Sequence, residues 1–246
     1  MKLVSQYSTQ QFPTFLNNSV DPELQKKAIS PDEAAAWDQH LQASLLTSGW
    51  TLMQRAATQI AKLVRAMNPR EMTVFVCGPG NNGADGLVAA TFLAKQKRAV
   101  KVVSPCLGPS PQSLFSKSLK AAARENVEVE WNFKASKLEA LQPGLWVDAL
   151  LGIGQSRPLQ GNLLETVNRL QTHSSPILSV DCPTGLDGET GKSIPIAVTA
   201  AQTLTFFAPK QGFFTADGPR HCGKITVSHL GTDPAALKGW LSAHRK

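Results

Sequence analysis

The sequence GPGNNGADG at residues 78–86 follows an apolar run, TVFVC at residues 73–77, and precedes LVAATFLAKQ. The apolar run is typical of a buried strand, and the segment after the glycines has the residues of a helix. Gly78, Gly80 and Gly83 match the dinucleotide-binding pattern G-x-G-x-x-G. A strand, a glycine-rich turn and a helix in this order predict an α/β unit whose turn faces a ligand.

The rest of the chain repeats this alternation of short apolar runs and helical segments. Such a pattern predicts a mostly parallel sheet that is covered by helices on both faces. A capping box at Ser30 and Glu33 predicts a helix, and helical apolar spacing from Met53 to Val64 predicts a second helix before any strand. Predicted strands lie at residues 73–77, 100–104, 127–131, 145–150, 176–181, 203–208 and 224–228, and the later helices near 85–96, 111–125, 159–171 and 233–243.

The length of 246 residues fits one α/β domain. Residues 1–28 show no clear period and are predicted to be an irregular arm, so the domain is assigned to residues 29–246. The four cysteines are far apart, which argues against a zinc site and favours reduced thiols in the cytoplasm. No window approaches the roughly 18 apolar residues of a membrane span, so no membrane partner is expected.

The net charge of +7 favours anionic partners without choosing among nucleotides, nucleic acid and membranes. The basic clusters at residues 95–98 and 244–246 lack interleaved aromatic residues, so single-stranded nucleic acid is not supported as a partner. We therefore interpret both clusters as solvated surface.

Polar residues follow several of the predicted strands. Because ligands bind beyond the carboxyl ends of parallel strands, these residues are expected to share one sheet edge. Taken singly, each has a structural alternative: Asp148 as a buried structural acid, Asp181 as a turn former, and Lys210 and Arg157 as surface residues. The convergence of several loops on one edge favours a ligand crevice formed by Asp85, Asp148, Gly152, Gly154, Ser156, Arg157, Asp181, Thr184, Gly185, Asp187 and Lys210.

The turn does not have the residues of the usual dinucleotide-binding site. The second strand ends in VVSPCLG, without the acid that normally holds the ribose, and Asp85 would repel a phosphate if it faced the turn. Asp85 could instead cap a helix that begins at Gly86. Amides and carboxylates suit a neutral polyol, an amide or a hard cation, for which Asn82, Asp148 and Thr184 could supply oxygen ligands.

Four ordered motifs, GPGNNGADGLVAA, VDALLGIGQSRPLQG, SVDCPTGLDGETG and LTFFAPKQGF, resemble those of the NAD(P)H-hydrate epimerases, the YjeF N-terminal domain family. The helix LMQRAATQIAKLV is also similar, so the resemblance runs from about Ile29 to about Gly231. It implies a Rossmann-like three-layer sandwich. It also implies an isomerase that interconverts the R and S forms of NADHX and NADPHX, hydrates of NADH and NADPH with a hydroxyl at C6, for cofactor repair.

The resemblance also implies site residues. Substrate-binding positions map onto Asn81, Asn82, Gly83, Ala84 and Asp85, and onto Gly152, Ile153, Gly154, Gln155, Ser156, Arg157, Pro158 and Asp181. Asp181 is the candidate catalytic acid/base and Lys210 the second candidate. Potassium ligands map onto Asn82, Asp148 and Thr184.

Some positions depart from the family pattern. Ala84 replaces the usual Gly, which would cost about 1 kcal/mol if the backbone there needs a positive φ. The family's dehydratase domain is absent, so the chain is a standalone epimerase or an excised half, with an NAD(P)HX dehydratase as its functional partner. A homodimer is left open. Two alternatives remain: a non-catalytic binding or scaffold module with this fold, and an NAD-dependent dehydrogenase, which the missing ribose-binding acid disfavours.

Overall fold

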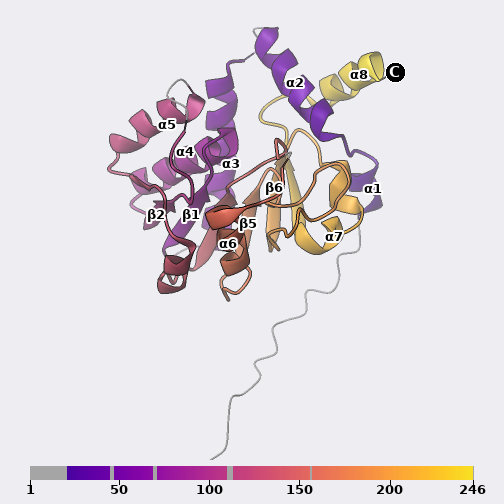
Figure 1. Cartoon of the computed structure of the whole chain (residues 1–246). Coiled ribbons are helices and arrows are strands. Elements are labelled where there is room, and N and C mark those ends of the chain that lie inside the picture. The colour runs from indigo at the N-terminus through magenta and orange to yellow at the C-terminus, as the bar shows by residue number, and fades with distance from the viewer. Residues whose placement is uncertain (1–20, 45–46, 69–70, 110–112, 156, 246) are drawn as a thin grey trace, which may run out of the picture.

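The computed structural model describes residues 21–44, 47–68, 71–109, 113–155 and 157–245 (Figure 1). In this part of the chain helices and strands alternate after three helices at the N-terminal side. The helices are α1 (Pro22–Gln25), α2 (Pro31–Ala43), α3 (Gly49–Met67), α4 (Asn81–Lys95), α5 (Leu114–Ala123), α6 (Gly161–Leu170), α7 (Gly218–His221) and α8 (Pro234–His244), with short 3₁₀ turns η1 (Ala135–Ala140) and η2 (Gln211–Phe214). The strands are β1 (Thr73–Cys77), β2 (Val100–Val103), β3 (Val129–Glu130), β4 (Leu145–Ala149), β5 (Ile177–Val180), β6 (Gln202–Phe206) and β7 (Lys224–Ser228).

The strands form one parallel sheet in the order β3-β2-β1-β4-β5-β6-β7. The chain runs from β1 outward to β3, then returns to β4 on the other side of β1 and continues to β7. The strand order therefore reverses between β1 and β4. In open parallel sheets the crevice at such a reversal is where ligands bind.

Successive residues of the central strands pack on opposite faces of the sheet. In β1, Phe75 and Cys77 belong to a core with α3, α4 and α5, whereas Val74 and Val76 belong to a second core with α6. Both faces are thus covered, which explains the uninterrupted apolar runs in the sequence. The predicted three-layer, Rossmann-like architecture is confirmed.

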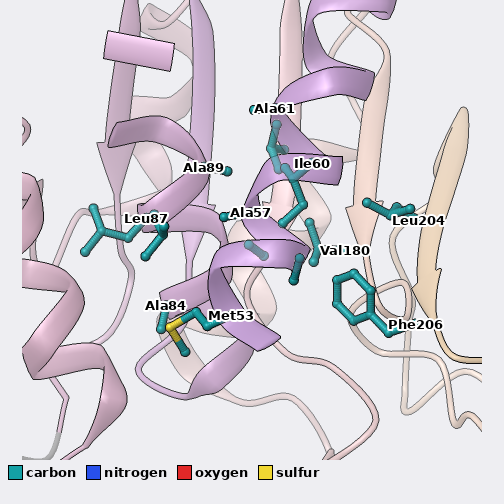
Figure 2. Packing of buried hydrophobic residues seen from close by; sticks show 14 of the residues in the cluster. Met53, Ala57, Ile60, Ala61, Ala84, Leu87, Ala89, Val180, Leu204 and Phe206 are labelled. Atoms are coloured by element: carbon teal, nitrogen blue, oxygen red, sulfur yellow. The ribbon is translucent and has the colours of Figure 1, made fainter. Parts of the chain in front are cut away.

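Helix α3 fills the centre of the larger core. Figure 2 shows Ala57 and Ile60 of α3 between α4 and the sheet residues Val180 and Leu204. The small alanine side chains of α3 allow it to pack closely against both α4 and the sheet. The apolar spacing of about 3.6 residues in the sequence therefore corresponds to a helix with a wide buried face.

The N-terminal segment differs in part from the prediction. Residues 22–25, within the arm predicted to be irregular, form one turn of helix capped by the Asp21 carboxylate. Residues 1–20 lie outside the described part of the chain. The predicted capping box at the start of α2 is confirmed: Ser30 Oγ accepts from Glu33 N at 3.0 Å, and Ser30 N donates to Glu33 Oε2 at 2.8 Å.

Two element boundaries also need correction. Helix α4 begins at Asn81, four residues before its predicted start, and β3 is shorter than the predicted run at 127–131. The turns α7, η1 and η2 were not expected, since each is too short to show a period. The remaining strands and helices lie at their predicted positions, and their ends differ from the predicted ends by a few residues.

All four cysteines are free thiols in the structure. Among the described residues, no helix has the length and apolar character that a bilayer crossing requires.

Candidate functional site

The loops after β1 and β4 meet at the point where the strand order reverses. A Cβ added to Gly83 would lie 1.9 Å from the Gly78 carbonyl oxygen, and one added to Gly78 would lie 1.8 Å from the Leu150 carbonyl oxygen. No side chain fits at such distances, so these glycines allow the turn, the helix start and the β4 loop to lie in contact. The sequence GPGNNG is thus explained by close backbone approach.

The first turn of α4 carries the polar part of the motif. Gly80 occupies the N-cap position and makes no side-chain capping bond, so the first backbone N–H groups of α4 have no side-chain cap. Asp85 lies in the second turn, so the alternative that it caps a helix from Gly86 is wrong. Ala84 has ordinary helical geometry and is fully buried near Met53 (Figure 2), so the expected cost of a positive φ does not arise.

A cleft of about 560 Å³ opens above this edge. One wall consists of the α4 start and the loops after β4, β5 and β6, and the other consists of α2 and α3. Helix α2 is fixed at its beginning, because Ile29 pairs with the segment at Lys210: Ile29 N donates to Pro209 O at 2.9 Å, and Gln211 N donates to Ile29 O at 3.0 Å. The wall from α2 is therefore anchored to the same loop that carries Lys210.

Asp181 and Lys210 form an ion pair at the floor of the cleft. Lys210 Nζ lies 3.1 Å from Asp181 Oδ1 and donates also to Thr205 Oγ1 at 2.7 Å and to two backbone carbonyls. Asp181 Oδ2 accepts from Ile153 N at 3.1 Å. The carboxylate is thus held from two directions by Lys210 and Ile153. The backbone of Asp181 is left-handed, with φ of 65°. Lys210 is fully buried, so its interpretation as a surface residue is wrong.

Asp148 lies at the end of β4 and is fully buried among neutral donors. Oδ1 accepts from Thr184 Oγ1 at 2.6 Å and Leu150 N at 3.3 Å, and Oδ2 accepts from Ser179 Oγ at 2.8 Å and Thr184 N at 2.9 Å. Burial raises the pKa of this carboxyl, while the four hydrogen bonds oppose the rise. Within the described residues Asp148 has no ion pair, so its charge lacks a protein counter-ion.

Two amides beside this edge have unused hydrogen-bonding groups. Both side-chain polar atoms of Asn82 are buried without a partner in the described structure, and so is Gln155 Nε2. Gln155 Oε1 accepts from Gly185 N at 2.8 Å, which fixes the orientation of that amide. Buried amides are almost always hydrogen-bonded, so these atoms mark positions that a ligand or ion would satisfy.

Two further carboxyls face the cleft. The pKa of Asp85 is raised well above its ordinary value, first by burial and then by the charges of Asp181 and Asp38. The pKa of Asp38, on α2, is raised by burial, with a contribution from the charge of Asp181. Asp38 was not predicted as a site residue, because it lies in an ordinary helical stretch that carries no motif.

The structure brings most of the predicted residues together at the cleft. Asp148 and Thr184 lie buried beneath the cleft, and Gly83 and Ala84 are buried within α4. Arg157 and Pro158 are exposed and do not line the cleft, whereas Ser156 lies outside the described residues. The cleft is lined by Asn81, Asn82, Asp85, Gly152, Ile153, Gly154, Gln155, Asp181 and Lys210.

The fold has a solved counterpart. The crystal structure of yeast ynu0 (YNL200c) superposes with a TM-score of 0.71 at 24% identity, covering 85% of this chain and 95% of the yeast chain. At this identity the similarity establishes the fold.

Sequence comparison identifies the family. The family described as "YjeF-related protein N-terminus" matches residues 49–212. A Rhodopirellula baltica protein named NAD(P)H-hydrate epimerase is 29% identical over 92% of this chain and 95% of its own length, and one of the same name from Levilactobacillus brevis is 31% identical over 83% and 94%. A Thermanaerovibrio acidaminovorans protein named Bifunctional NAD(P)H-hydrate repair enzyme Nnr is 34% identical, and this chain spans about 37% of its length. The chain belongs to the YjeF-related protein N-terminus family.

Proposed function

We propose that this protein is an NAD(P)H-hydrate epimerase that interconverts the R and S forms of NADHX and NADPHX at C6. The observation that carries the proposal is the Asp181–Lys210 pair at the floor of a cleft, on the sheet edge where the strand order reverses. The names of two relatives that align over nearly their whole length support the same activity.

The chemistry of the hydrate sets what the site must do. The lone pair of the ring nitrogen forms a double bond to C6 as the C6–oxygen bond breaks, and a proton converts the leaving oxygen to water. A planar iminium remains, and water can return to either face, giving up a proton. A group near C6 must therefore donate a proton and later accept one.

Asp181 is our candidate for this acid/base group. Its side chain is partly exposed at the cleft floor, and its two oxygens are held by Lys210 Nζ and Ile153 N. Lys210 donates to four oxygens, more than the number of its N–H groups, so all of its donors are committed within the protein. We therefore assign Lys210 the role of a positioning residue that fixes the Asp181 carboxylate and balances its charge.

The substrate is proposed to contact the two polar loops. The start of α4, from Asn81 to Asp85, would contact the nicotinamide end, where its uncapped backbone N–H groups can donate to the carboxamide oxygen. The loop from Gly152 to Gln155 would form the other side; the exposed Arg157 and Pro158 lie further from it.

Potassium is proposed as the bound ion, held by Asn82, Asp148 and Thr184. The fit rests on two observations: the buried Asp148 carboxyl faces neutral donors, and the buried Asn82 amide lacks a partner among the described residues. A cation beneath the cleft would balance the charge of Asp148 and give the Asn82 amide oxygen a partner. When bound, it would supply a fixed positive charge that holds the two loops together. Ion binding should raise the melting temperature with concentration, in potassium but not in a bulky organic cation at equal ionic strength.

An NAD(P)HX dehydratase is the proposed functional partner, since the longer relatives carry the name bifunctional repair enzyme. The four free thiols support a cytoplasmic location. A homodimer remains an untested prediction.

The direct test follows the two C6 epimers by chromatography, with and without the protein. We expect equilibration of either purified epimer, with one oxygen from labelled water gained at C6 per event. Asp181→Asn should reduce the rate by about 100-fold or more while the substrate still binds.

The matched control is Asp32→Asn, an equal charge change at an exposed position of α2, which should retain the wild-type rate. Circular dichroism and melting curves of each variant separate loss of chemistry from loss of fold. Failure of the wild-type protein to equilibrate the epimers would contradict the proposal and favour a binding module.

A further inference from the structure

The charges that line the cleft do not balance. Among its described lining residues, three are acids, Asp38, Asp85 and Asp181, and one is a base, Lys210. Lys210 is paired with Asp181. Even if Asp85 is counted as neutral, one carboxyl, that of Asp38, has no opposing cation in the cleft.

Asp38 comes from outside the segment that the family comparison matches. Residues 49–212 carry that match, whereas Asp38 lies on α2 and reaches the cleft from the opposite wall. Its Oδ2 accepts from Gln42 Nε2 at 2.6 Å, a neutral donor on the same helix. Nothing in that contact neutralises the carboxyl.

The position of Asp38 is fixed by packing. The neighbouring Trp37 is buried against Trp240 of α8, with ring centroids 5.6 Å apart, and Arg245 pairs with Glu33 at 2.6 Å. Figure 1 shows α8 lying beside α2. Together with the Ile29 pairing described above, these contacts hold the Asp38 carboxyl over the sheet edge.

A second observation indicates that the cleft is made for a ligand. Asn82 and Gln155 line it, and their amide nitrogens, which donate hydrogen bonds and are not ligands of a metal cation, are buried without a partner in the described structure. A ligand that matches the Asp38 carboxyl and these amide groups combines a positive charge with the hydrogen-bonding groups of an amide.

We propose that the cleft binds a planar organic cation of the nicotinamide type, and that Asp38 is a further catalytic residue that stabilises the positive charge on this ring. The proposal rests on the proposed function, because the iminium formed when hydroxide leaves C6 is such a cation. Fixed negative charge next to a developing cation lowers the barrier, since it requires no rearrangement during the reaction.

Binding can be tested without the epimerisation assay. The probes are the 1-methylnicotinamide cation and uncharged nicotinamide, which share the carboxamide and the ring and differ by the methyl group and the charge. Dissociation constants of both are measured by NMR titration of the full chain. We expect the wild-type protein to bind the cation about two- to fivefold more tightly than nicotinamide, the size of an ion pair at a partly exposed site.

The variants locate the effect. Asp38→Asn should remove the preference for the cation, Asp38→Glu should retain part of it, and Asp32→Asn on the same helix should leave it unchanged. In the epimerisation assay Asp38→Asn should lower kcat more than it raises KM. Equal affinity of the wild-type protein for both probes, or a cation preference that survives in a folded Asp38→Asn protein, would overturn the proposal. Cation preference without epimerisation would instead refute the proposed function, and with it the catalytic role of Asp38, while the cation-binding cleft would stand.

Discussion

The Asp148→Asn substitution tests how far the site depends on one buried carboxylate. Asp148 accepts four hydrogen bonds, two on each oxygen, from Thr184, Ser179 and Leu150. Asparagine retains one oxygen, and its NH₂ group would then face two donors. Each buried donor left without an acceptor costs about 1–3 kcal/mol, giving about 2–6 kcal/mol in total.

Removal of the charge offsets part of this loss, because burial disfavours the ionised carboxyl. A cost near the bottom of that range, about 2–3 kcal/mol, is therefore expected. For a protein of this size each kcal/mol lowers the melting temperature by about 2–4 °C, so the decrease should be roughly 4–12 °C.

Thermal melting followed by circular dichroism measures this shift, with Ser179→Ala as a graded comparison. That variant removes one of the four donors and should cost about 1 kcal/mol. A melting temperature of Asp148→Asn within about 2 °C of the wild type would refute the reasoning that the four bonds hold the β4 and β5 loops together.

Asp85→Asn should stabilise the fold at pH 7, because the carboxylate is disfavoured by burial and by the charges of Asp181 and Asp38, and the neutral amide is not. The pKa of Asp85 is raised from 3.8, so wild-type stability falls as pH rises above that value; a melting-temperature advantage of the variant that does not grow from pH 4 upward would contradict this. Lys210→Met should cost about 3–5 kcal/mol in urea unfolding, because Asp181 loses its buried cation, and an unchanged midpoint would argue against the pair. Gly83→Ala should lose about 3 kcal/mol, since its Cβ would meet the Gly78 carbonyl, and wild-type stability in the same assay would show that the loops are further apart.

The order and kind of the main elements were predictable because the central strands are buried on both faces. Phe75 and Val76 point to opposite cores, and both cores require apolar residues, so the strand is continuous and apolar in the sequence. The start of α4 was not predictable from that signal. Asn81 and Asn82 are poor helix formers. They nevertheless begin the helix, because the close backbone contacts at Gly78 and Gly83 determine where the chain turns into α4.

The candidate site was predictable where side chains follow strands, as for Asp148 and Asp181. The burial of Lys210 was not, because it depends on Thr205 and on carbonyls that only the folded β6 end supplies. Asp38 could not be found from its neighbours in sequence, since its place opposite Asp181 results from the packing of α2 on α8 and from the Ile29 pairing.

The two walls of the cleft are built by separate parts of the chain. The sheet edge carries Asp181 and Lys210, whereas α2, which carries Asp38, is a cover attached through Ile29 and backed by α8. A cover with its own attachments can change its inward-facing residues without disturbing the hydrogen bonds of Asp148 or Asp181. Substitutions at Ala35 and Gln39, which line the cleft from α2, are consequently the place to alter which ring or ribose the site accepts while Asp38 and Asp181 are retained.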